Sequence, residues 1–122
     1  MPAQPRNALL RVVRGEDDGK GWDLVPGQTY TVGRSHKCNL SISDRTASGS
    51  HAQIECREGV WMISDLDSSH GTRVNRQRIL APKPLFDRDA IQCGKTLLEF
   101  REYEDLAPSD LAEIDKGLDI PE

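Results

Sequence analysis

Apolar and polar residues alternate along most of this chain in short runs, and turn residues separate the runs. Leucine, β-branched and aromatic side chains recur at every second position within a run, whereas Gly, Pro, Asn and Asp gather between runs. A two-residue period is typical of strands with one buried face. We predict strands over residues 8–13, 22–25, 29–32, 40–42, 51–56, 60–64, 72–74, 77–80, 90–93 and 96–103.

The strand pattern predicts an all-β fold. Turn signals recur every eight to twelve residues or so, as in β-sandwiches, and the lack of a helical period before residue 104 excludes parallel βαβ units. We expect a β-sandwich of two mostly antiparallel sheets with about ten or eleven short strands. The proline-rich segment 82–84 is expected to be a connector, and we assign the aromatic residues to core or edge packing: Trp22, Tyr30, Trp61, Phe86 and Phe100.

The ends of the chain differ in character from its middle. Residues 1–7 carry two prolines and no apolar period, which predicts a flexible arm before a domain over residues 8–103. Residues 104–122 hold seven acidic residues and one lysine, so this acidic tail or linker carries a charge of −6. Leu111, Ile114 and Leu118 are spaced as on one face of a short helix, and a solvated tail is the alternative.

Composition and charge exclude several classes of protein. The chain has 122 residues, of which 36% are hydrophobic and 30% charged, as in soluble globular domains. Without the acidic tail the net charge is about +2 and the arginines are scattered, which argues against nucleic-acid binding through a basic face. The first residues lack the apolar core of a signal peptide, and no run is long enough to cross a membrane, so we expect a cytoplasmic protein.

The cysteines and histidines do not form a recognisable metal site. Cys38, Cys56 and Cys93 are odd in number and lack the C-x-x-C spacing of zinc sites and the pairing of disulfide frameworks. Cys56 and Cys93 fall in apolar runs and are interpreted as small core residues. We expect no metal and no cofactor.

Three clusters of polar residues and glycines stand where strands end. They are Gly33-Arg34, Ser48-Gly49-Ser50-His51, and Ser68-Ser69-His70-Gly71-Thr72 followed by Val74-Asn75. A guanidinium fork with small hydroxyl donors suits the charge and the three acceptor oxygens of a phosphate group, and glycines let the backbone approach a ligand. The clusters therefore predict an anion site built from loops.

The order and spacing of these clusters resemble those of the forkhead-associated (FHA) domain, a phosphothreonine-recognition module. The resemblance covers about residues 8–103 and includes a closing pattern at Leu85, Asp89 to Ile91 and Gly94. It implies a non-catalytic module that binds phosphothreonine-containing protein partners downstream of a Ser/Thr kinase, with no nucleic acid or membrane partner. Further domains of a larger chain remain compatible with it.

The resemblance also assigns roles to individual residues. Arg34 would hold the phosphate oxygens, Ser48 would donate its hydroxyl, and Ser69 would take the hydroxyl position of the third cluster. Gly49 and His70 would complete the phosphopeptide-binding residues. Gly33, His51 and Gly71 would support the site structurally, with His51 tying the loop that it closes.

Two positions depart from the family pattern. His70 stands where the family has asparagine, and Gly49 stands where it has a basic residue. An uncharged imidazole offers one donor and one acceptor in a different geometry from an amide. The alternative function is therefore a degenerate FHA sandwich that mediates phosphorylation-independent protein interaction or self-association.

A hydrolase is a second rival. Asp65, Ser68 and His70 supply the residue types of a catalytic triad within six positions. A triad is defined by its geometry, and residues so close in one loop rarely achieve it. We therefore expect the chain not to be an enzyme.

Overall fold

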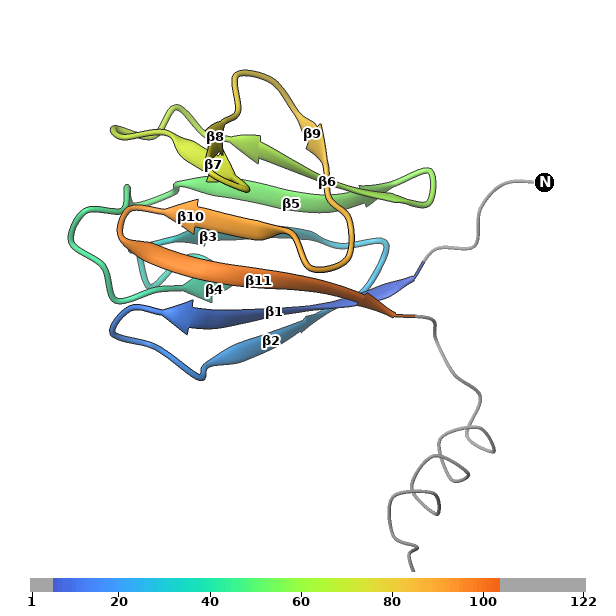
Figure 1. The fold of residues 1–122 in the computed structure, drawn as a ribbon, viewed down its shortest axis with the longest axis horizontal. Helices are drawn as coiled ribbons and strands as arrows, with labels where there is room; N and C mark the ends of the chain where they lie inside the picture. The colour runs from blue at the N-terminus through green and yellow to red at the C-terminus, as the bar shows by residue number, and fades with distance from the viewer. Residues whose placement is uncertain (1–5, 104–122) are drawn as a thin grey trace, which may run out of the picture.

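The computed structural model of this protein describes residues 6–103, which form two packed β-sheets (Figure 1). The predicted arm, apart from its last two residues, and the predicted acidic tail lie outside these described residues. The possible helix near Leu111 therefore lies outside them as well.

The first sheet has six strands and the second has five. In spatial order the first contains β2 (Gly21–Leu24), β1 (Asn7–Arg14), β11 (Thr96–Tyr103), β10 (Ala90–Cys93), β7 (Thr72–Val74) and β8 (Gln77–Arg78). The second contains β4 (Leu40–Ser41), β3 (Thr29–Gly33), β5 (Ala52–Arg57), β6 (Val60–Asp65) and β9 (Lys83–Pro84). Neighbouring strands are antiparallel except β3 and β4, which are parallel, so the predicted all-β sandwich is confirmed.

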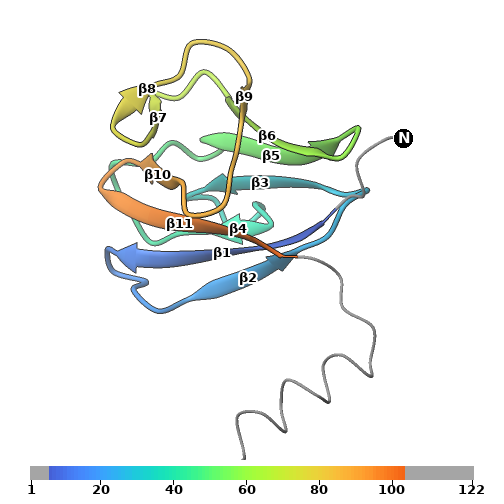
Figure 2. The same cartoon turned by 45° about the vertical axis from the view of Figure 1, so that its right-hand side comes forward.

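Alternating side chains of both sheets build the core between them. In β1 Ala8, Leu10 and Val12 are fully buried. Trp61 of β6 and Phe100 of β11 meet edge to face with ring centroids 6.2 Å apart, which joins the two sheets directly. The two-residue period in the sequence thus corresponds to one buried face per strand. Figure 2 shows the two sheets from a second direction.

The structure corrects two expectations for the segment between β8 and β10. Residues 83–84 are not a plain connector, because Pro84 and Lys83 pair with Met62 and Ile63 at the edge of the second sheet. Phe86 is not a packing residue, because its side chain is 62% exposed. The preceding Leu85 takes the core position, and the period of two then directs Phe86 outward.

The three cysteines are free thiols. Cys93 is fully buried, and burial raises its pKa to about 12, helped by the charges of Asp65 and Asp44. Cys56 is half-buried against the core rather than enclosed in it. Within the described residues no group of His, Cys, Asp and Glu could hold a metal ion, and no helix is long and apolar enough to cross a membrane.

The sandwich gathers its polar loops at one end. The connections β3–β4, β4–β5 and β6–β7 and the β10–β11 turn lie together, on the left in Figure 1, whereas β1 begins and β11 ends on the opposite side. The first two clusters and residues 68–72 of the third belong to this loop end, whereas Asn75 follows β7 and bonds to Asp89 and Ala90 at the start of β10.

Candidate functional site

The backbone places Arg34 beside Ser48. Two backbone hydrogen bonds join the chain after β3 to the β4–β5 loop, because the Arg34 N–H donates to the Ser48 carbonyl at 3.0 Å and the Ser35 N–H donates to the Gly49 carbonyl at 3.1 Å. The first two clusters are therefore neighbours.

Gly33 makes this pairing possible. A Cβ added at Gly33 would overlap the carbonyl oxygen of Gly49 and lie 3.0 Å from the backbone nitrogen of His51. Both obstacles are backbone atoms, which cannot rotate away as a side chain can. The absence of a side chain at Gly33 therefore lets the β4–β5 loop lie against β3.

The hydroxyl of Ser48 connects the second cluster to the third. Its oxygen accepts a hydrogen bond from the Ser69 N–H at 2.9 Å and lies 3.5 Å from the Ser69 hydroxyl. Ser48 is half-buried and Ser69 is exposed. The hydroxyl–hydroxyl contact is long for a hydrogen bond, so both groups can turn to donate to an incoming acceptor.

His51 lies beneath these loops and joins them. Its Nδ1 accepts the Ser48 N–H at 3.0 Å, so its Nε2 carries the proton and donates to the Gly71 carbonyl at 2.9 Å. The side chain is fully buried. This geometry supports the expected structural role of His51 and fixes its tautomer.

Gly71 requires a glycine for its own conformation. Its φ is +84°, and an added Cβ would lie 2.5 Å from Nε of Arg78. L-residues with a side chain rarely adopt this backbone conformation. The turn that presents Ser69 and His70 therefore depends on Gly71.

The Arg34 side chain lines a hollow of about 280 Å³ together with Glu16, His36 and Arg45, and neither Ser48 nor Ser69 lines this hollow. Arg34 is exposed, and its guanidinium makes no hydrogen bond or ion pair with another residue of the described part of the chain. No hydrogen bond or ion pair within the described residues therefore fixes the Arg34 side chain, and only its backbone is held next to Ser48.

His70 does not line the hollow that contains Arg34. Its Nδ1 donates to the Thr46 carbonyl at 3.2 Å, which joins the β6–β7 and β4–β5 loops and leaves Nε2 free of this bond. His70 is exposed and also lines a second hollow, of about 340 Å³, between the two loops and the β10–β11 turn.

Two carboxylates, the buried Asp44 and the half-buried Asp65, brace the loops, and sequence reasoning did not identify this role. Asp44 accepts hydrogen bonds from the N–H and hydroxyl of Thr46, and from the Lys95 N–H and Thr96 hydroxyl across the sandwich. Burial raises its pKa, but these hydrogen bonds outweigh burial and lower the pKa to about 2. The Asp-x-Thr spacing of an Asx turn was the available sequence signal.

Asp65 braces the third cluster and argues against the hydrolase. It accepts the hydroxyls of Ser68 and Thr72 at 2.5 and 2.7 Å, and these bonds, with the Ser68 N–H, lower its pKa against the effect of burial. The Ser68 hydroxyl thus donates its hydrogen bond to the Asp65 carboxylate, and His70 bonds to the Thr46 carbonyl instead of to Ser68. The structure does not bring Asp65, Ser68 and His70 together as a triad.

The fold and the loop end define a class of protein: a β-sandwich that presents hydroxyls, glycines and unpaired cations on adjacent loops. The sequence model of the FHA domain matches residues 30–94, and the chain belongs to the FHA domain family. This confirms the predicted family.

Comparisons with individual proteins agree with this assignment. The chain is 36% identical over 94 residues to the oxoglutarate dehydrogenase inhibitor of Corynebacterium glutamicum, which covers 77% of the chain and 64% of that protein. The structure resembles the FHA domain of an Arabidopsis thaliana protein with a TM-score of 0.80 and 30% identity, over 88% of the chain and 94% of that domain. It also resembles Mycobacterium tuberculosis EmbR, in complex with a low-affinity phosphopeptide, with a TM-score of 0.71 and 26% identity, over 85% of the chain and 26% of EmbR. The chain spans less than two thirds of the length of such curated relatives.

Proposed function

We propose that this chain is a non-catalytic module that binds phosphothreonine-containing protein partners in cytoplasmic Ser/Thr kinase signalling. The observation that carries the proposal is the meeting of two hydroxyls from different loops, Ser48 and Ser69, beside the backbone of Arg34. The phosphopeptide complex of the relative EmbR supports the same ligand class. The domain itself would occupy residues 8–103, and further domains of a larger chain are compatible with the proposal.

The chemistry of the site fits a phosphate monoester. Such a group carries about −1.5 to −2 charges near neutral pH and has three acceptor oxygens. Ser48 and Ser69 offer hydroxyl donors, and Arg34 is a cation without an internal partner that can turn toward them. Gly49 leaves open space above the loop, since an added Cβ would meet nothing closer than 4.0 Å.

The side chains near the site also support binding without catalysis. The Ser68 hydroxyl is bonded to Asp65 and the residue is only 8% exposed, so it is poorly placed as a nucleophile. His70 is held by the Thr46 carbonyl and has no bond to a serine hydroxyl in the described part of the chain. A bound phosphate would therefore be held and not transferred.

Matched phosphorylated and unphosphorylated threonine peptides test the proposal. We expect the phosphorylated peptide alone to bind tightly, and Arg34→Ala to weaken it about 30-fold, since a charge-assisted hydrogen bond contributes about 2 kcal/mol. Arg57→Ala, which removes an arginine paired with Glu55, is the matched control and should bind normally. Isothermal titration calorimetry measures all three.

Equal affinities for the two peptides would favour the alternative function. His70 and Gly49 depart from the family pattern, and these departures are the reason for the alternative of a phosphorylation-independent protein interaction or self-association. In that case Arg34→Ala would bind both peptides as the wild type does.

A further inference from the structure

Arg34 shares its hollow with a carboxylate from a loop outside the three clusters. We call this space the Arg34 hollow, and the titratable and charged residues that line it are Glu16, Arg34, His36, Asp44 and Arg45. Ser48 and Ser69, the hydroxyl donors of the proposed phosphate site, do not line it. The structure thus places the Arg34 side chain beside a carboxylate and not between the two serines.

Of the two carboxylates in the Arg34 hollow, Glu16 is the one that is free to accept a cation. Asp44 is buried, and each of its two oxygens already accepts two hydrogen bonds. Glu16 is exposed, and its side chain forms no hydrogen bond or ion pair within residues 6–103. Glu16 and Arg34 therefore face one hollow with opposite charges, without a direct ion pair between them.

The β1–β2 loop holds Glu16 at this position. On one side of Glu16, the Asp17 carboxylate accepts the N–H of Ser43, which itself lines the Arg34 hollow. On the other side, Gly15 has a φ of +136° and lies so close to β11 that an added Cβ would be 3.2 Å from the Thr96 hydroxyl. Contacts on both sides of Glu16 thus fix its backbone, so the carboxylate is a constant feature of the Arg34 hollow.

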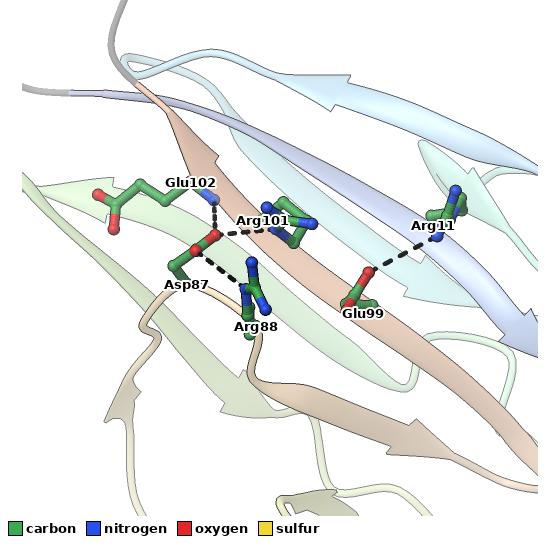
Figure 3. Close-up of polar contacts among 6 residues, drawn as sticks. All are labelled: Arg11, Asp87, Arg88, Glu99, Arg101 and Glu102. Atoms are coloured by element: carbon green, nitrogen blue, oxygen red, sulfur yellow. Dashed lines mark hydrogen bonds and ion pairs between the residues drawn. The ribbon is translucent and has the colours of Figure 1, made fainter.

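Exposed carboxylates on this sandwich pair with arginines where they meet. Figure 3 shows Asp87 with both Arg88 and Arg101, at 3.8 and 3.1 Å. One carboxylate can therefore attract two arginines, and Glu16 likewise faces two in the Arg34 hollow. Interactions between exposed charges are weak, so a phosphate with about −1.5 to −2 charges can displace such a partner.

We propose that Glu16 is a positioning residue for the phosphate site, which competes with the bound phosphate for the guanidinium of Arg34. In the free protein the Glu16 carboxylate attracts the guanidinium into the Arg34 hollow, and a phosphopeptide must draw it toward Ser48 and Ser69. The apparent affinity then falls with the fraction of molecules whose Arg34 rotamer faces the serines. The inference rests on the proposed function for the place of the phosphate.

The side-chain Nε–H signal of Arg34 tests the attraction without any ligand. In ¹⁵N-labelled protein at mildly acidic pH, this signal is assigned by its loss in Arg34→Ala. We expect Glu16→Gln to shift it, because the variant removes the opposite charge from the Arg34 hollow. The control Asp18→Asn removes the same charge from an exposed residue of the same loop that does not line the hollow, and should leave the signal in place.

Phosphopeptide affinity measures the competition. The probe is a nine-residue peptide with a central phosphothreonine and alanine elsewhere. At low salt Glu16→Gln should bind it about threefold more tightly than the wild type does, as expected for the loss of one exposed ion pair. Asp18→Asn should bind it as the wild type does, and isothermal titration calorimetry compares the three proteins.

A double-mutant cycle separates positioning from simple repulsion. If Glu16 acts through Arg34, the threefold gain from Glu16→Gln should disappear in an Arg34→Ala background. A gain of the same size in both backgrounds would mean that Glu16 repels the phosphate directly, which would overturn the positioning role.

Failure of this inference differs from failure of the proposed function. Phosphate-dependent binding that Glu16→Gln leaves unchanged, or an Arg34 Nε–H signal that does not move, would overturn the inference alone. Equal binding of phosphorylated and unphosphorylated peptides would contradict the proposed function and the competition with phosphate together. The Nε–H signal would then still decide whether Glu16 attracts Arg34 in the free protein.

Discussion

Gly33 at the end of β3 and Gly49 in the β4–β5 loop lie against each other but have opposite reasons for being glycine. A side chain at Gly33 would overlap the Gly49 carbonyl, whereas a side chain at Gly49 would project into open space. Neither has a positive φ, so the difference between them is steric and not conformational. Substitutions at Gly33 and Gly49 therefore differ only in whether they disturb the packing of the β4–β5 loop against β3.

We expect Gly33→Ala to lower the free energy of unfolding by about 1–3 kcal/mol, as overpacking does, and to weaken phosphopeptide binding. Gly49→Ala should change the free energy of unfolding by about 0.5 kcal/mol or less. Urea denaturation compares the two variants. Equal stability of both variants would mean that the hydrogen bond between the Arg34 and Ser48 backbones does not depend on the lack of a side chain at Gly33.

Arg34, Ser48 and Ser69 illustrate what sequence can and cannot predict about a site. Backbone hydrogen bonding brings residues 34 and 48 together, and the Ser69 N–H donates to the Ser48 hydroxyl. The direction of the Arg34 side chain does not follow from these bonds, since an exposed side chain without a partner has several accessible rotamers. The ligand-binding roles of Arg34, Ser48 and Ser69 stay predictions, which phosphopeptide titration tests.

Short connections between strands determine the shape of the loop end more than the strands do. Asp44 accepts two hydrogen bonds from Thr46 in its own β4–β5 loop and two from Lys95 and Thr96 at the β10–β11 turn, and its pKa is about 2 instead of 3.8. A carboxyl group with a lowered pKa stabilises the folded state when ionised. That contribution is complete above the unfolded pKa of 3.8 and is lost as pH falls through about 2.

We expect Asp44→Asn to lower the free energy of unfolding by about 2 kcal/mol near neutral pH, and the gap from the wild type to close as pH falls from 4 to 2. Denaturant unfolding at a series of pH values measures the gap. A gap that stayed constant down to pH 2 would show that the ionised carboxylate is not the stabilising form.

Strands with a clear two-residue period were predictable, and the one missed strand had no such period. β9 contains only Lys83 and Pro84, and it pairs at an edge of the second sheet, where proline is tolerated. Its pairing is a property of β6 and not of its own sequence. The role of Asp44 was likewise not predictable from the local sequence, because its partners Lys95 and Thr96 lie some fifty positions away.

Charge is divided unevenly over the protein. Residues 104–122 carry −6, whereas the loop end presents Arg34, Arg45, Arg73 and Lys95 without ion-pair partners in the described part of the chain. Nineteen residues in extended form span up to about 60 Å, which exceeds the length of β11. The acidic tail therefore has the reach and the sign of charge to compete weakly with an anionic ligand.

Deleting residues 104–122 should raise phosphopeptide affinity about threefold at low salt, and the difference should disappear near 1 M salt, where the screening length is about 3 Å. Titrations of the intact and truncated chains at both salt concentrations test this. Identical affinities at low salt would assign the tail to another role.

A phosphothreonine peptide titrated into ¹⁵N-labelled protein tests most directly whether three loops hold one phosphate. The account predicts that the largest amide shifts fall at residues 34–35, 48–50 and 69–71, and that the unphosphorylated peptide leaves these amides unchanged. Shifts of equal size with both peptides, or shifts confined to the end of the sandwich where β11 terminates, would contradict it.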